Sequence, residues 1–304
     1  MKYLWILITC FFMRSSLAGN DADSLGECFP NEKTITQSFT IDNKANESFG
    51  QTLKKISQNP DVFGAIISHY PGTVGTLRAK DWTPPLDIIG HQGLAIQYIN
   101  NERYFWGSLN EDYSSDPGAY AIRYKLEGGA VNSVEFFKIF SDRNTKQPTS
   151  PTISADGKYL IVQMVRKNEY EIRSFNLDML SHEGDFSNSY SHHFILKRER
   201  QKNGPYAAQA LASDGARIFM LMGSFKVDEI NILNIYTISG AFIESVPLRF
   251  GEERARNTGK GTHYEPEGLT WLKTAKGSEL ILQVAAGDGK NRSCLLYGTG
   301  IHAQ

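Results

Sequence analysis

Short apolar segments separated by turn residues dominate the chain from about residue 32 onward. Four of them read YLIVQM, IFMLM, ILNIY and LILQV, at residues 159–164, 218–222, 232–236 and 280–284. Gly, Asp, Asn, Ser or Pro follows or precedes each run, and such regularly punctuated strands are typical of all-β sandwiches, barrels and propellers. Only residues 48–56 permit a helix.

The segments form a repeat with a period of 58 residues. HQGLAIQYINNERYFWGS, from His91, resembles AQALASDGARIFMLMGS, from Ala208: each has Gln, a small residue, Leu and Ala, then a turn and a run that ends in Gly-Ser. Asp156 and Asp214 begin matching Asp-Gly turns 58 residues apart, and Glu267 follows Gln209 by the same distance. Repeats of this length indicate a propeller or a solenoid.

Each unit has room for four antiparallel strands, which bury both faces only when neighbouring units stack around a ring. Residues 32–304 hold slightly fewer than five units of 58. We therefore predict one five-bladed β-propeller of four-stranded blades over residues 32–304. The repeat is weak in residues 32–90, and we expect the end of the chain to supply the outer strand or strands of that blade.

The first 18 residues have the pattern of a secretory signal peptide: a positive start, an apolar run at residues 3–13 and a small-x-small site at residues 16–18. The alternative is a lipoprotein modified at Cys10. Residues 19–31 form a segment between the signal and the propeller. No later stretch reaches 18 apolar residues, so we expect a secreted or periplasmic protein that does not span a membrane.

Two cysteines remain after removal of the signal, Cys28 and Cys294, at opposite ends of the chain. In an oxidising compartment such a pair is typical of a disulfide, and a closed ring brings the two ends together. The alternative is two unpaired cysteines. Asn46 and Asn291 lie in N-x-S sequons, which matter only if the source glycosylates exported proteins.

The net charge gives no sign of a nucleic-acid partner. The whole chain carries −1, and loss of Lys2 and Arg14 with the signal leaves −3. The basic stretch at residues 197–202 is either a solvated loop or a contact for an anionic glycan. We expect a monomer.

The first residues of the repeat are candidates for a site. Gln92, Pro151, Gln209 and Glu267 occupy equivalent positions, and equivalent positions of innermost strands converge near the axis of a propeller. The predicted ligand-binding residues are Gln92, Tyr206, Gln209, His263, Tyr264 and Glu267. Amides and carboxylates bind sugar hydroxyls, and tyrosine rings pack on sugar faces. The alternatives are polar side chains that bond one another or water, and a bound cation.

Catalysis has less support in the sequence. Glu265 and Glu267 would point the same way about 7 Å apart along an extended strand, although Pro266 lies between them. Asp288 lies in a glycine-rich turn. No G-x-S-x-G, H-E-x-x-H or phosphate-binding loop occurs. We assign no catalytic residue, metal ligand or cofactor.

Several of these motifs resemble one propeller group. HQGLA, AQALASDG, YEPEGLTW and AAGDGKNRSCLLYG, over residues 85–300, look like the repeated motifs of helveticin-type bacteriocins, teichoic-acid biosynthesis protein C and the receptor-binding propellers of some phage tails. The resemblance implies a five-bladed propeller that recognises a bacterial cell-surface glycopolymer, with Gln92, Gln209 and Glu267 at the motif positions. Pro151 departs from the pattern.

A second resemblance concerns EGLTW, which is similar to a motif of gluconolactonase-like propellers. It implies a metal-binding glutamate at Glu267 and six blades, for which the 58-residue period leaves too little chain. The sequence therefore predicts an exported propeller that binds a surface carbohydrate through its channel mouth. The alternatives are a metal-dependent hydrolase that uses Glu267, lactonase-like or glycan-cleaving, and a scaffold that holds another protein on its rim.

Overall fold

The computed structural model describes residues 24–30, 35–58, 61–111, 113, 115–141, 148–166, 169–197, 200–201, 204–205, 207–224, 226, 229–257, 263–287 and 293–304. The expected signal peptide, Tyr206, Asp288 and Asn291 lie outside these residues. Among those described, no helix has the length and apolar character needed to cross a bilayer.

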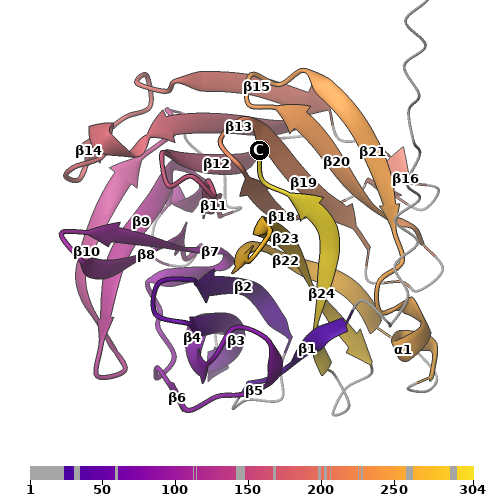
Figure 1. Cartoon of the computed structure of the whole chain (residues 1–304). Coiled ribbons are helices and arrows are strands. Elements are labelled where there is room, and N and C mark those ends of the chain that lie inside the picture. The colour runs from indigo at the N-terminus through magenta and orange to yellow at the C-terminus, as the bar shows by residue number, and fades with distance from the viewer. Residues whose placement is uncertain are drawn as a thin grey trace, which may run out of the picture.

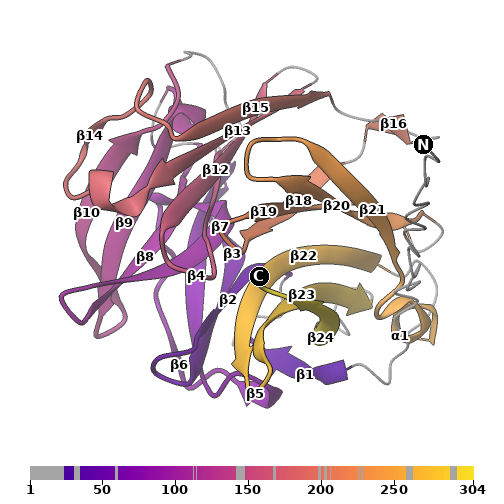
Figure 2. The same ribbon diagram turned by 45° about the horizontal axis from the view of Figure 1, so that its top comes forward.

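The protein is a five-bladed β-propeller, as the repeat predicted. Five sheets form the blades, and their main strands pair antiparallel. Figure 1 shows them arranged around a common centre, and Figure 2 shows the same ring tilted. The main strands of each repeat unit form one sheet because consecutive strands pair antiparallel. The two faces of each sheet are then buried against neighbouring blades.

The first blade contains, from the axis outward, β2 (Thr36–Asp42), β3 (Glu47–Gln58), β4 (Asp61–Pro71) and β6 (Asp81–Trp82). The second contains β7 (Ile89–Ile99), β8 (Glu102–Leu109), β9 (Tyr120–Glu127), β10 (Ala130–Lys138) and the added β14 (Gly184–Asp185). The third contains β11 (Ser150–Ile153), β12 (Tyr159–Arg166), β13 (Glu169–Asn176) and β15 (His192–Lys197).

The fourth blade contains β18 (Ala207–Ser213), β19 (Arg217–Gly223), β20 (Asn231–Thr237) and β21 (Phe242–Leu248). The fifth contains β22 (His263–Thr274), β23 (Gly277–Gly287), β24 (Ser293–His302), β1 (Ser24–Phe29) and β5 (Gly75–Arg78). Small elements complete the chain: the hairpin β16 (Arg200–Gln201) and β17 (Gly204–Pro205), the helix α1 (Glu252–Asn257) and two 3₁₀ turns.

Two features of the first blade were not predicted from the sequence. Residues 48–56, where a helix was permitted, lie in the long strand β3, because a hairpin with β4 and pairing with β2 satisfy the backbone. The first blade also needs no strand from the chain end. Instead, β1 pairs antiparallel with β24 in the last blade, to which the described residues from 263 onward contribute three strands.

The predicted disulfide lies at this closure. Cys28 on β1 and Cys294 on β24 are direct cross-strand partners with their Cα atoms 5.0 Å apart, and a disulfide joins them. Both views place β1 beside β24 (Figures 1 and 2). Both cysteines are buried in an apolar cluster with Phe39, Tyr70 and Leu296, between the last and the first blade.

Candidate functional site

Four of the five innermost strands carry a register shift near the point where they enter the channel. The shifts lie at residues 36–38 in β2, 89–94 in β7, 208–210 in β18 and 266–268 in β22. A bulge places an extra residue in one strand and re-aims its side chain. The residues at these points are Gln37, Gln92, Gln209 and Glu267, so the bulges coincide with the predicted ring.

The third blade differs, as its proline indicated. β11 pairs with β12 without a shift, and Pro151 occupies the ring position. Gly93 lies against it with a φ of +75°, and a Cβ there would come within 2.4 Å of the Pro151 ring. The glycine after Gln92 is therefore needed both for its backbone conformation and for the close approach of two blades.

Gln37 is a ring member that the sequence analysis missed. Its Nε2 donates to Glu267 Oε1 over 3.2 Å and so links the first blade to the last. The signal was present in the sequence, since Gln37-Ser38-Phe39-Thr40 follows the same order as Gln92-Gly93-Leu94-Ala95. The spacing of 55 residues instead of 58 hid the match.

The ring narrows the channel to a neck. The cavity there has a volume of about 20 Å³ and is lined by residues of all five blades, among them Gly93, Pro151, Gln209 and Glu267. This is the space for about one water molecule. The neck separates an entry-side mouth, where the innermost strands begin, from an exit-side mouth, where they end.

The entry-side mouth holds a cavity of about 270 Å³. Gln92, Gln163 and Gln209 line it from three successive blades, with His91 and Glu111. Gln163 is 3% exposed, and its Oε1 has no hydrogen-bond partner among the described residues. Sequence analysis missed this residue, whose signal was a single polar position inside the apolar run at residues 159–164.

His91 adds little charge to this cavity, because burial lowers the pKa of its imidazole. At neutral pH the walls therefore present amides and a neutral imidazole, with the carboxylate of Glu111 at the side. These groups donate and accept hydrogen bonds with a neutral, hydroxyl-rich ligand.

Three side chains near the start of β22, in the last blade, lie close together. His263 Nε2 lies 2.8 Å from Glu265 Oε2, and Gln209 Nε2 donates to Glu265 Oε1 over 2.6 Å. Potential ligand atoms of His263, Glu265 and Glu267 all lie within 4.8 Å of one another. Glu267 is 3% exposed.

Tyr264 does not reach the mouth. Its side chain is 2% exposed and packs between the fourth and fifth blades with Leu269, Trp271 and Phe250. The reason is the alternation of side chains along a strand, which sends Tyr264 to the face opposite His263 and Glu265. Burial raises the pKa of its hydroxyl.

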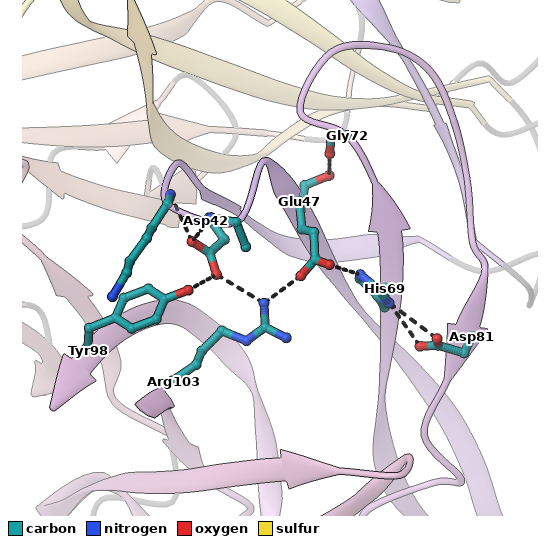
Figure 3. Close-up of polar contacts among 10 residues, drawn as sticks. Asp42, Glu47, His69, Gly72, Asp81, Tyr98 and Arg103 are labelled. Atoms are coloured by element: carbon teal, nitrogen blue, oxygen red, sulfur yellow. Dashed lines mark hydrogen bonds and ion pairs between the residues drawn. The ribbon is translucent and has the colours of Figure 1, made fainter. Parts of the chain in front are cut away.

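The exit-side mouth holds a larger cavity of about 480 Å³, lined partly by Asp42, Lys44 and Tyr98. Beside it, Figure 3 shows a chain of polar contacts between the first two blades. Tyr98 Oη donates to Asp42 Oδ2 over 2.7 Å, and Arg103 Nη1 contacts both Asp42 and Glu47, at 3.0 and 2.6 Å.

This chain continues outward to His69. The imidazole lies between Glu47, 3.3 Å from Nε2, and Asp81, 3.2 Å from Nδ1, and stacks on the Phe49 ring (Figure 3). Because each nitrogen faces a different carboxylate, these groups do not converge on one point. The cluster joins strands of two blades and fills the gap between them.

Comparison with known proteins supports the fold. The sequence matches no family model, and no curated protein sequence matches it. Among solved structures, the tail fibre of Staphylococcus aureus phage P68 superposes with a TM-score of 0.63 and 18% identity, over 90% of this chain and 52% of the fibre. The chain thus spans about half the length of that fibre.

Two glycan-degrading enzymes have a similar fold. An exo-β-1,3-galactanase from Clostridium thermocellum superposes with a TM-score of 0.56 and 10% identity, over 90% of this chain and 61% of the enzyme. An endo-arabinase from Bacteroides thetaiotaomicron superposes with a TM-score of 0.54 and 12% identity, over 91% of this chain and 98% of the enzyme. At these identities, the chain shares the five-bladed propeller fold with a phage fibre and with glycoside hydrolases.

Proposed function

We propose that this chain is an exported propeller that binds a bacterial surface glycan or glycopolymer through its entry-side mouth, in the manner of a bacteriocin or a phage receptor-binding protein. The observation that carries the proposal is the convergence of Gln92, Gln163 and Gln209 on one cavity. An unpaired buried amide oxygen costs about 1–3 kcal/mol, which a ligand hydroxyl would offset.

The composition of the mouth favours a carbohydrate over other ligands. Amides of three blades lie around a cavity of about 270 Å³, close to the lower end of the range for small-molecule sites. One or two sugar units of a longer chain would enter it. The rest of the polymer would lie across the rim, near Glu111.

Export has support from the ends of the chain. The signal-like pattern of residues 1–18 and the Cys28–Cys294 disulfide both suit an oxidising compartment. The names of the similar structures, a tail fibre, a galactanase and an arabinase, fit a surface-glycan ligand.

The alternative is hydrolysis with Glu267. The five blades argue against a lactonase-like enzyme, for which the resemblance implied six. The neck argues against glycan cleavage at Glu267, since a space of about 20 Å³ does not admit a sugar ring. Release of reducing ends from cell-wall polymers, lost in Glu267→Gln, would restore the hydrolase as the better function.

The binding proposal is tested with purified cell-wall glycopolymers and a glycan array. We expect wild type to bind at least one of them and a Gln92→Ala/Gln163→Leu double variant to lose at least tenfold in affinity. The matched control is Gln97→Ala, which removes a glutamine from the exit-side cavity. Equal binding by wild type and the double variant would show that the entry-side mouth is not the glycan-binding site.

A further inference from the structure

The strand β22 brings an imidazole and two carboxylates to one point beside the neck. In a regular strand, alternate residues are about 7 Å apart, so His263 and Glu267 would lie far from each other. The bulge at residues 266–268 shortens and bends this strand. As a result, ligand atoms of His263, Glu265 and Glu267 come within 4.8 Å of one another.

Glutamines from the neighbouring blades orient both carboxylates. Gln209 of the fourth blade donates to Oε1 of Glu265, and Gln37 of the first blade donates to Oε1 of Glu267. In metal sites, outer groups of this kind hold one oxygen of a carboxylate and leave the other to the ion. The other oxygen of Glu265, Oε2, contacts His263 Nε2 over 2.8 Å, so the imidazole and the carboxylate lie side by side.

The position is enclosed and small. The side chains of His263 and Glu265 are 14% and 17% exposed, and Glu267 is 3% exposed. Glu267 and Gln209 also line the neck cavity of about 20 Å³, which has the size of one water molecule or one ion. Two carboxylates this close repel each other in a desolvated place unless they share a positive charge.

From this geometry we propose that His263, Glu265 and Glu267 form a binding site for a divalent transition-metal ion. A mixed set of one imidazole and two carboxylates suits Zn²⁺ or Mn²⁺, whereas Mg²⁺ and Ca²⁺ prefer oxygen ligands alone. The protein supplies three ligands and leaves the remaining positions to water. The site does not rest on the proposed glycan binding, although Gln209 lines the mouth cavity and also orients Glu265.

The test is isothermal titration of metal-stripped purified protein at pH 7.5 with ZnCl₂, MnCl₂ and CaCl₂ in separate runs. We expect one Zn²⁺ or Mn²⁺ per chain and a raised melting temperature with that ion. His263→Ala and Glu265→Gln should each lose at least tenfold in affinity while keeping the wild-type circular dichroism. Gln209→Ala should lose about tenfold, as for other outer-shell groups.

His69→Ala is the matched control, because His69 also has two carboxylate neighbours but not at one point. Its metal affinity should equal that of wild type. The proposal is overturned if no transition metal binds, if Ca²⁺ alone binds, or if both site variants bind as wild type does. Glycan binding is measured separately, so its failure leaves the metal result unaffected.

Discussion

Cys28 and Cys294 are cross-strand partners that fasten the first described strand of the chain to the last. Because β1 is the fourth strand of a blade whose three inner strands come from the end of the chain, the bridge holds the ring closed. A disulfide with a sequence separation of 266 residues restricts the unfolded chain strongly.

A Cys28→Ser/Cys294→Ser variant should therefore lose about 2–5 kcal/mol of unfolding free energy. Urea unfolding followed by tryptophan fluorescence measures the loss, with reduced wild type as the control. Unchanged midpoints in both samples would mean that the pairing of β1 with β24 closes the ring without the bridge.

Gln163→Leu should leave the unfolding free energy unchanged or raise it by about 1 kcal/mol. The substitution removes a buried carbonyl oxygen that has no partner among the described residues, and with it the cost of desolvation. The same variant should bind the glycan more weakly than wild type.

Gln51→Leu provides the comparison for stability. Gln51 is also fully buried, and its Oε1 likewise has no partner among the described residues, but its Nε2 donates to the Gly90 carbonyl. Loss of that hydrogen bond should cost about 1 kcal/mol. Chemical denaturation of both variants gives the two changes in unfolding free energy. A Gln163→Leu protein as destabilised as Gln51→Leu would show that Gln163 serves the fold.

His91 should make the fold less stable in mild acid. Burial lowers its pKa in the folded protein below the ordinary value of 6.5, so the unfolded chain takes up a proton first as the pH falls. Its contribution to stability is present above about pH 6.5 and is lost as the pH falls from there to the folded pKa.

Melting temperatures at pH 7.5 and 5.5 test this prediction. The wild-type decrease should exceed that of His91→Gln, which has no proton to gain. Parallel decreases in the two proteins would show that another group governs the acid response.

Asp42→Asn should destabilise the protein by about 2 kcal/mol at neutral pH, because Tyr98 and Arg103 lose an ionised acceptor. Burial by itself raises the pKa of Asp42, but hydrogen bonds from Tyr98, the Ala45 backbone and Arg103 outweigh it and hold that pKa below its usual value. The carboxylate therefore stabilises the fold above the unfolded pKa of about 3.9.

As the pH falls from about 3.9 through the folded pKa of Asp42, this contribution disappears. The difference in unfolding free energy between Asp42→Asn and wild type should then narrow. Urea midpoints at pH 7 and pH 3 measure the change. A gap of constant size would indicate that the charge of Asp42 is unimportant and that only its shape matters.

Local sequence determined much of the architecture. Strands are recognisable from apolar runs and turns, and the repeat of a four-strand unit places Gln92, Gln209 and Glu267 at one ring because equivalent residues of equivalent blades meet at the axis. The same reasoning brought Cys28 and Cys294 together, since a ring has adjacent ends.

Only the tertiary structure decided how the ring closes and which side chains share a cavity. Strand pairing joins residues far apart in the chain, so β1 takes its place in the last blade without any local signal. The contact of Gln37 with Glu267 likewise depends on how the first and last blades meet. The alternation along β22 buries Tyr264, and its bulge brings Glu267 towards His263. These outcomes depend on register, and register is set by the packing of neighbouring blades.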